Sequence, residues 1–159
     1  MRPVALDYRI DNLRDAASHR ATVADRIWRA WWAPDGRSLA EVDAALAAIL
    51  ATEGFPFSLV AHAEDQFLGT VTAVMDDIPD RPHLGPCLAA LWVEPEARGE
   101  GIGEAMMVAL CSKLKRLGFG KVYLSAKPPM RDFYAQRGWT LIETGVSKDD
   151  LDVFQRALP

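Results

Sequence analysis

The sequence has little of several features that mark particular classes of protein. It contains two cysteines, no excess of positive charge, and no apolar run long enough to cross a bilayer. Its formal net charge is −4, so it lacks the basic footprint of a nucleic-acid-binding protein. We therefore expect neither a membrane nor a nucleic acid as its partner.

The scarcity of cysteine limits the chemistry of the thiols. Cys87 and Cys111 do not have the spacing of metal ligands, and each lies within an apolar pattern. We expect both to be reduced thiols in the core of a cytoplasmic protein, and we expect no metal site. A chain of 159 residues, half of them apolar, is predicted to fold as a single domain covering residues 1–159.

What the sequence does contain is a regular succession of apolar patterns. Periods of 3.6 predict helices from Asp11 to Trp32, from a capping box at Ser38 to Gly54, from Gly103 to Leu117 and from Met130 to Gln136. Alternating or continuous apolar runs predict strands at Val4–Ile10, Phe57–Ala63, Phe67–Met75, Cys87–Val93, Val122–Ser125, Trp139–Glu143 and Asp152–Leu158.

Three glycines on alternate residues follow the most apolar of these strands. Gly99, Gly101 and Gly103 come after a turn at Pro95 and directly before a helix. The first N–H groups of a helix lack partners within it and lie at its positive end, so they bind anions well. We interpret the segment as a phosphate-binding loop for a nucleotide-like cofactor. The alternative is a glycine-rich turn that only joins a strand to a helix.

Two common phosphate loops do not fit this spacing. A nucleoside-triphosphate loop needs Lys-Ser or Lys-Thr after its last glycine, where this chain has Glu104 and Ala105. A dinucleotide loop needs a third glycine, where this chain has Glu104 or Met106, depending on the frame. The pattern that remains is Arg98-x-x-Gly101-x-Gly103.

That pattern resembles the acyl-CoA pyrophosphate loop of the GNAT superfamily of N-acetyltransferases. A second segment, Phe133-Tyr134-Ala135-Gln136-Arg137-Gly138-Trp139, is similar to the family's Phe/Leu-Tyr-x-x-x-Gly-Phe. The order of predicted elements also resembles that of the family over essentially the whole chain. The resemblance implies an α/β (α+β) fold, with a mixed, mostly antiparallel sheet of about seven strands and helices on both faces.

The resemblance also implies that the cofactor is acetyl-CoA. The backbone of Leu91 to Val93 would lie along the pantetheine arm and could donate an N–H group to the thioester carbonyl. One departure is Lys127, which stands where the family often has an asparagine that contacts this arm. The residues expected to bind CoA are Leu91, Trp92, Val93, Arg98, Gly99, Glu100, Gly101, Ile102, Gly103, Ser125, Lys127 and Tyr134.

By the same resemblance, Tyr134 is the expected general acid near the sulfur atom. A tyrosine of pKa about 10 facing a thiol of about 8.5 makes complete proton transfer unfavourable by roughly 2 kcal/mol. A hydrogen bond that stabilises the thiolate therefore remains an alternative to full transfer. A further alternative is a tyrosine that packs in the core with its hydroxyl group at the rim.

The general base is harder to assign. Members of the family often have a carboxylate or histidine on the central strand, but residues 87–93 include neither. The nearest candidates are Glu94, at the end of this strand, and Asp76, in the preceding loop with Asp77 and His83. A solvated loop explains these residues equally well, and a water chain or an amine of low pKa would remove the need for a base.

The acceptor pocket of the family is usually framed by the first two helices and the loop after the third strand. In this chain that points to Trp28, Trp31, Trp32 and Phe55 beside Asp77. Aromatic walls with carboxylates suit an apolar amine, whose cation can rest on a ring face. The alternative is that some of these tryptophans belong to the core.

Three hypotheses follow. The first is an N-acetyltransferase that moves the acetyl group of acetyl-CoA to a primary amine, of a small molecule, a peptide N-terminus or a lysine, by direct attack in a ternary complex. The second is a non-catalytic acyl-CoA-binding sensor or partner module, suggested by the missing base and by Lys127. The third, a homodimerising structural domain without a ligand, leaves the glycine spacing unexplained; a homodimer is compatible with all three.

Overall fold

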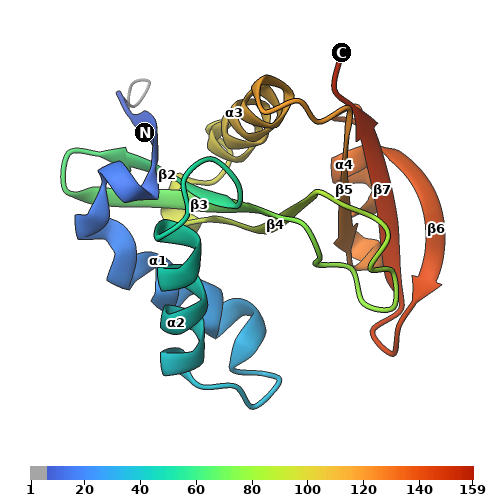
Figure 1. The fold of residues 1–159 in the computed structure, drawn as a ribbon, viewed down its shortest axis with the longest axis horizontal. Coiled ribbons are helices and arrows are strands. Elements are labelled where there is room, and N and C mark those ends of the chain that lie inside the picture. Colours follow the sequence, from blue (N-terminus) through green and yellow to red (C-terminus); the bar gives the residue numbers. More distant parts are fainter. Residues whose placement is uncertain (1–6) are drawn as a thin grey trace. The chain divides into compact units, whose positions relative to one another are not determined.

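A computed structural model describes residues 7–159, and Figure 1 shows it as a ribbon. The predicted strand at Val4–Ile10 lies partly outside the described residues. The helices are α1 (Arg20–Ile27), α2 (Leu39–Leu50), α3 (Ile102–Arg116) and α4 (Arg131–Ala135), and the strands are β1 (Arg9–Asn12), β2 (Phe57–Ala63), β3 (Gln66–Val74), β4 (Cys87–Val93), β5 (Lys121–Ala126), β6 (Thr140–Val146) and β7 (Leu151–Ala157).

The strands form a seven-stranded sheet in the order β1-β2-β3-β4-β5-β7-β6. β4 pairs with β5 in parallel at Cys87 and Tyr123, whereas β1 with β2, β5 with β7 and β6 with β7 are antiparallel. The predicted fold class, a mixed and mostly antiparallel sheet combined with helices, is confirmed.

The described residues divide into two compact units. The first unit contains residues 7–72 and 90–109, and the second contains residues 73–89 and 110–159. β1, β2, α1 and α2 lie wholly in the first unit, and β5, β6, β7 and α4 lie wholly in the second. β3, β4 and α3 each begin in one unit and end in the other.

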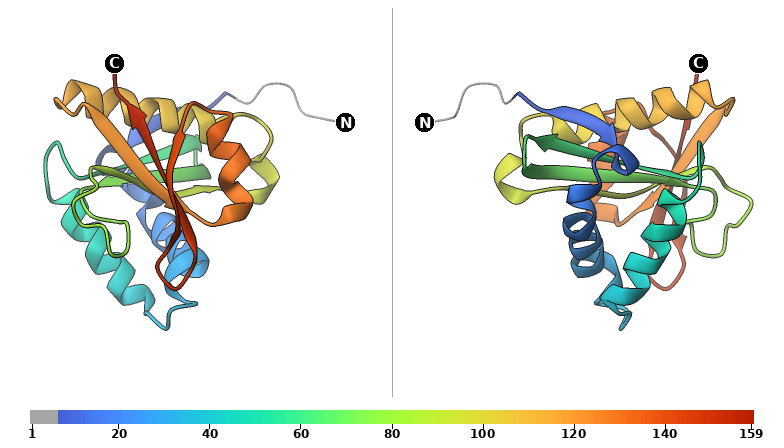
Figure 2. Two further views of the ribbon diagram at one scale, coloured as in Figure 1. Left: turned by 90° about the vertical axis from the view of Figure 1, so that its right-hand side faces the viewer. Right: turned by 60° about the vertical axis from the view of Figure 1, so that its left-hand side comes forward.

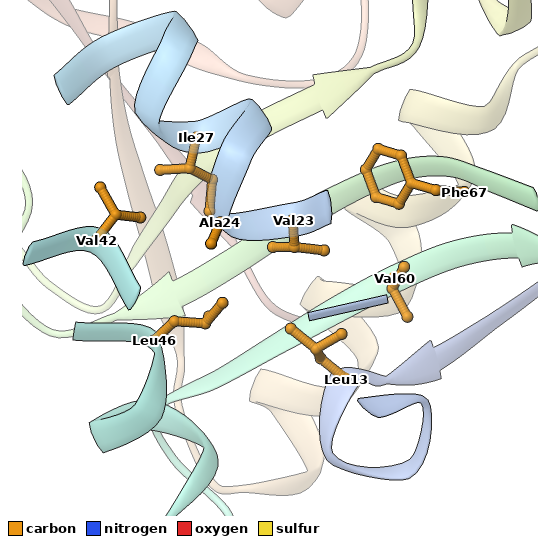
Figure 3. Close-up of a cluster of buried hydrophobic side chains, with 8 residues drawn as sticks. All are labelled: Leu13, Val23, Ala24, Ile27, Val42, Leu46, Val60 and Phe67. Carbon is orange, nitrogen blue, oxygen red and sulfur yellow. The ribbon is translucent and has the colours of Figure 1, made fainter. Parts of the chain in front are cut away.

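In the first unit, α1 and α2 lie side by side on one face of β2 and β3 (Figure 2). Both helices turn their apolar stripe toward these strands because burial of that stripe is the main favourable term for a helix of this length. The close-up in Figure 3 shows the resulting cluster, whose members are Leu13, Val23, Ala24, Ile27, Val42, Leu46, Val60 and Phe67.

The start of α2 confirms the predicted capping box. The Ser38 hydroxyl group accepts a hydrogen bond from the Glu41 N–H group at 3.2 Å, and the Glu41 carboxylate accepts one from the Ser38 N–H group at 3.1 Å. Two N–H groups that the helix cannot satisfy are thereby paired.

The prediction of one helix from Asp11 to Trp32 is wrong for residues 11–19. Asp11 lies in β1 opposite Val60, and its carboxylate contacts His62 Nε2 at 2.8 Å. Two 3₁₀ turns then precede α1, which begins at Arg20. Strand pairing with a segment about fifty residues away therefore overrides the local helical pattern, an effect that periodicity alone does not reveal.

β3 and β4 approach each other closely at Gly69. A Cβ atom at this position would lie 2.7 Å from the main-chain oxygen of Trp92 and 2.8 Å from Cε of Met106, on the first half of α3. The carbonyl group belongs to the backbone and cannot move aside as a side chain can. Only glycine fits here without displacing β4.

The second unit has its own apolar cluster, which includes Ile78, Cys87, Val146 and Val153. Two bidentate ion pairs tie its segments together. Arg131, the first residue of α4, donates to both oxygens of the fully buried Asp152 in β7, at 2.9 and 2.8 Å. Arg81, in the loop after β3, donates to both oxygens of Glu143 in β6.

The Gly69 approach gives a prediction about stability. Replacing Gly69 with alanine should lower the free energy of unfolding by about 1–3 kcal/mol, the usual cost of an overpacked site. Urea denaturation measures this as a lower midpoint with an unchanged slope. The matched control is Gly120→Ala, because a Cβ atom at Gly120 would meet nothing within 4 Å. Equal midpoints for the two variants would show that β4 yields at this point.

Candidate active site

The predicted phosphate-binding loop lies in the first unit, between β4 and α3. Pro95–Ala97 form a 3₁₀ turn, and Gly99 and Gly101 both have φ of +80°, a conformation that favours glycine. The Gly101 carbonyl group accepts the first bond of the helix, from the Ala105 N–H group at 3.0 Å. The preceding N–H groups of α3, from Ile102 onward, therefore lie at its positive end, as the sequence predicted.

The surroundings of this loop fit a bulky anion. A Cβ atom at Gly101 would meet nothing within 4 Å, and one at Gly103 would come within 3.4 Å of Val93 Cγ2 only. Glu100 and Glu104, whose charges would oppose an anion, are both exposed residues. The loop residues present thus fit a diphosphate bound through main-chain N–H groups at the N-terminus of a helix.

Arg98 lies at the entrance to the loop. Its Nε donates to the Val93 carbonyl group at 2.8 Å, and its guanidinium carbon lies 4.8 Å from the centre of the Trp92 ring. The first contact satisfies an exposed carbonyl group at the end of β4, and the second is a cation–π contact. Arg98 is therefore both a structural residue and a positive charge beside the loop.

β4 leads into this loop and contains one irregularity. Ala90, in the middle of the strand, has φ of +52°, which is rare for a residue with a side chain. Leu91, Trp92 and Val93, the predicted partners of the pantetheine arm, follow it directly and are all half-buried. Strained residues of this kind often cluster at functional sites, and composition gives no signal for them.

Glu94 is held by several partners in the first unit. Its carboxylate accepts hydrogen bonds from Arg26 Nη2 at 2.8 Å, from Arg26 Nε at 3.0 Å and from Trp92 Nε1 at 2.8 Å. The hydrogen bonds from Arg26 are the main reason why the pKa of Glu94 lies below its usual value. A carboxylate whose two oxygens are both engaged is poorly suited to accept a proton, so this geometry favours a structural role for Glu94 over the predicted base.

Three tryptophans of the predicted acceptor pocket lie in one π-helical turn, Trp28–Trp32, which extends α1. Trp28 donates its indole N–H to the Arg37 carbonyl group at 2.8 Å, and the Arg37 guanidinium carbon lies 4.8 Å from the centre of the Trp32 ring. Trp28 and Trp32 pack against the core of the first unit, whereas Trp31 is 41% exposed. π-Helical turns are frequent at functional sites.

Phe55, the fourth aromatic residue of that set, precedes β2. It is half-buried, and its ring lies 6.5 Å from that of Phe57 in an edge-to-face arrangement. The first unit contains most of the predicted site residues, namely Leu91–Val93, Glu94, the loop from Arg98 to Gly103, the π-helical turn and Phe55. The other predicted site residues, Asp76, Asp77, Ser125, Lys127 and Tyr134, belong to the second.

Tyr134 is the only member of the predicted set on α4. It is 7% exposed, and its ring contacts those of Phe133, Trp139 and Phe154, with centres 5.1, 6.2 and 5.6 Å away. Burial raises the pKa of Tyr134 to about 12, so the phenol group stays protonated at neutral pH. It can donate a hydrogen bond, but it releases its proton less readily than an exposed tyrosine does.

Ser125 and Lys127 lie at the end of β5, upstream of α4. Ser125 is half-buried and pairs with Val153 of β7, whereas Lys127 is exposed and precedes the 3₁₀ turn Pro128–Met130. The bidentate contact between Arg131 and Asp152 fixes the first residue of α4 on β7, and it thereby positions Tyr134 three residues later. Sequence reasoning missed this pair, because β7 also contains Gln155 and Arg156, so that one more polar residue in it gives no signal of a buried carboxylate.

Asp76 and Asp77 follow β3, close to Cys87 at the start of β4. Asp77 is an exposed residue, but desolvation by the chain around it, and secondarily the charge of Asp76, raise its pKa from the ordinary 3.8 to about 6. Cys87 donates to the Leu84 carbonyl group at 3.1 Å, and burial raises the pKa of its thiol to about 11. Neither cysteine forms a disulfide within the described residues; Cys87 lies in the core as predicted, whereas Cys111 is only half-buried. Cys87 is too weakly acidic to act as a nucleophile.

Comparison with known proteins agrees with this geometry. The sequence model of the acetyltransferase (GNAT) family matches residues 21–139, so the chain belongs to the GNAT acetyltransferase family, as the two motifs predicted. Acetyl-CoA is the acetyl donor of enzymes in this family, which agrees with the predicted cofactor. No curated protein sequence matches the chain, and no helix within residues 7–159 is long and apolar enough to cross a membrane.

Solved structures resemble the chain over nearly its full length. An aminoglycoside 6′-N-acetyltransferase complexed with coenzyme A superposes with a TM-score of 0.74 at 15% identity, covering 95% of this chain and 97% of that one. A Pseudomonas aeruginosa acyl-CoA N-acyltransferase gives 0.67 at 22% identity, over 96% and 99% of the two chains. The PaiA N-acetyltransferase of Thermoplasma acidophilum, in complex with coenzyme A, gives 0.69 at 15%, over 96% and 99%. At these identities the likeness concerns the fold.

The loop geometry gives a prediction about binding. Gly101→Val should weaken coenzyme A binding by roughly tenfold or more, because the side chain fills the open space beside the N-terminus of α3. The matched control is Gly118→Val at the other end of α3, where φ is +97° and a Cβ atom would again meet nothing within 4 Å. Isothermal titration calorimetry gives the affinities. Similar losses of affinity in both variants would count against a diphosphate site at Gly101.

The raised pKa of Asp77 gives a prediction about pH. Between pH 4 and 7 the folded chain binds a proton at Asp77 more readily than the unfolded chain, so this residue makes stability fall as pH rises. Asp77→Asn removes the effect, and the melting temperature of the variant relative to the original should therefore increase across this window. Asp76→Asn removes the neighbouring charge that raises the pKa of Asp77, so the pH range over which Asp77 lowers stability should end at a lower pH. If the melting temperatures of Asp77→Asn and the original protein change with pH in the same way between pH 4 and 7, the raised pKa of Asp77 is refuted.

Proposed function

We propose that this GNAT acetyltransferase transfers the acetyl group of acetyl-CoA to a primary amine by direct attack in a ternary complex. The observation that carries the proposal is the loop from Arg98 to Gly103, where two left-handed glycines precede the N-terminus of a fifteen-residue helix. Bound acetyl-CoA would supply the acetyl group as a thioester. The main-chain N–H groups at Ile102 and beyond, together with Arg98, would hold its diphosphate.

The main chain of β4 would align the cofactor, and Tyr134 would stabilise its leaving thiolate. The backbone of Leu91 to Val93, directly after the left-handed Ala90, would align the pantetheine arm, with Ser125 and Lys127 as further contacts. Tyr134 would donate a hydrogen bond to the departing sulfur atom. Because its pKa is about 12 and a thiol has about 8.5, complete proton transfer is unfavourable by about 5 kcal/mol. Stabilisation of the thiolate by a hydrogen bond is therefore favoured over full transfer.

The amine must lose a proton in the reaction, and we assign its acceptance to Asp77 rather than to Asp76 or Glu94. With a pKa of about 6, Asp77 is mostly ionised at pH 7 and is a stronger base than an ordinary aspartate. Glu94 is engaged by Arg26 and Trp92, as described above. A water molecule can relay the proton between the amine and the carboxylate.

The acceptor would be an amine with an apolar or aromatic part, recognised by the π-helical turn Trp28–Trp32 and by Phe55. Trp31, the most exposed of these tryptophans, offers a ring face on which an alkyl or ammonium group can rest. Small-molecule amines, peptide N-termini and lysines all share the reacting group. We place the protein in the cytoplasm, where acetyl-CoA is available and free thiols persist.

The test is release of the CoA thiol from acetyl-CoA across a panel of amines. The panel contains arylalkylamines, a lysine peptide, a peptide with a free N-terminus, and an aminoglycoside, because one structural neighbour is an aminoglycoside 6′-N-acetyltransferase. Turnover with at least one amine is expected, with an acidic limb near pH 6 that Asp77→Asn abolishes. Tight CoA binding without turnover by any amine would favour the non-catalytic acyl-CoA-binding module.

Tyr134→Phe tests the proton donor. It should lower kcat on the order of 10²-fold, within the range for one positioned proton donor, while the affinity for CoA changes little. Tyr123→Phe is the matched control, because this half-buried tyrosine packs in the apolar cluster of the second unit. If Tyr134→Phe retains the original kcat, the hydroxyl group has no role in the transfer.

A further inference from the structure

Three side chains connect α1 to the entrance of the loop, and all of them lie in the first unit. Arg26 of α1 donates to both oxygens of Glu94, and Trp92 donates its indole N–H to one of them at 2.8 Å. Glu94 is only 7% exposed, and its main chain is held as well, since its N–H donates to the Leu68 carbonyl group at 2.9 Å. Glu94, the residue that follows β4, is therefore fixed at both its side chain and its backbone.

Trp92 has a second contact on its ring face. The guanidinium carbon of Arg98 lies 4.8 Å from the ring centre, while Arg98 Nε donates to the Val93 carbonyl group. These two contacts fix the direction of a long side chain that would otherwise populate many rotamers. The Nη atoms of Arg98 have no hydrogen-bond partner within the described part of the chain, so they remain available to an anion.

We propose that Glu94 and Trp92 are positioning residues that orient Arg98 for the diphosphate of coenzyme A. This inference rests on the proposed function of the loop, and it replaces the role of base considered for Glu94. Glu94 fixes the plane of the Trp92 ring through the indole N–H, and the ring face holds the guanidinium group. An arginine that is already oriented loses less conformational freedom when it binds an anion, so the affinity rises without any new contact.

The role of Glu94 is to couple α1 to this arrangement. Arg26 anchors the carboxylate, and Arg26 also contacts Asp25, which in turn accepts from Arg29 Nε at 3.0 Å. The chain of contacts thus runs from α1, directly before the π-helical turn, to the entrance of the loop. A shift of α1 would move the Glu94 carboxylate, and with it the ring on which Arg98 lies.

A double-mutant cycle tests the proposal by calorimetry with coenzyme A. Trp92→Phe keeps a ring but removes the N–H group, and it should weaken binding about fivefold, whereas Arg98→Ala should weaken it about tenfold. In the Arg98→Ala background, Trp92→Phe should have little further effect, since the residue that it orients is gone. If Trp92→Phe weakens binding equally in both backgrounds, the ring acts by general loosening and the proposal is overturned.

The variant Glu94→Gln provides a second, independent test of the proposal. It should weaken coenzyme A binding by a similar factor and raise the KM for acetyl-CoA, while kcat at saturation is retained. A fall in kcat at saturation with an unchanged KM would instead make Glu94 the base. The matched control is Asp43→Asn, which removes another bidentate pair of α1, Arg20–Asp43, and should leave the affinity unchanged.

The experiment separates this inference from the proposed function. If the original protein binds coenzyme A but acetylates no amine, acetyl transfer is refuted, and the binding cycle still decides the roles of Trp92 and Glu94. If the original protein binds no coenzyme A, both proposals fall. Thermal melts of each variant identify any that is unfolded. If one test is lost in this way, the other, either the Trp92–Arg98 cycle or the Glu94→Gln variant, decides whether these residues orient Arg98.

Discussion

The ion pair between Arg26 and Glu94 joins α1 to the end of β4 in the first unit. Removal of two charges from water is costly, and a partly buried pair is favourable only when its geometry is good and its other hydrogen-bonding atoms are satisfied. Here both conditions hold, because the guanidinium group meets both oxygens of the carboxylate and Trp92 donates to one of them. The pair fixes the end of β4, and every residue of the loop is placed relative to that end.

The candidate site depends on main-chain conformation more than on side-chain chemistry. Gly99 and Gly101 adopt left-handed conformations, Gly69 lets β3 approach β4, and the N-terminus of α3 provides the N–H groups. Such features place dipoles without charged side chains, and they need little reorganisation when an anion binds. In the first unit, the one positive side chain that the loop places beside these N–H groups is Arg98, which rests on the Trp92 ring.

Much of the fold could be predicted from the sequence where one pattern dominates. β2 and β4 have the predicted bounds, because apolar runs bounded by proline, glycine or acidic residues leave little choice of ends. The loop was predictable for a similar reason, since three glycines at alternate positions have few other uses. The helix expected from Asp11 was wrong because β1 pairs with a segment about fifty residues away.

Two parts of the candidate site that the sequence did not reveal depend on partners distant in the chain. Arg26 looks like an ordinary surface arginine until Glu94, sixty-eight positions later, meets it. Asp152 is fully buried in β7, and nothing near it in the sequence identifies its partner Arg131, twenty-one positions earlier. The raised pKa of Asp77 has a different origin, since it follows from desolvation and from the charge of the adjacent Asp76, and two adjacent aspartates in a loop give no hint of which one is perturbed. Local periodicity contains no information about any of these pairings.

The left-handed Ala90 has a consequence for how this position can vary during evolution. Residues in the middle of a strand usually favour valine, isoleucine or threonine, whose branched side chains suit the pleated surface. At φ of +52° those same side chains are the most unfavourable choices, while glycine and asparagine become acceptable. Sequence drift at position 90 should therefore follow the rules of a turn inside a strand, and a valine there would mark a relative whose β4 takes a different path.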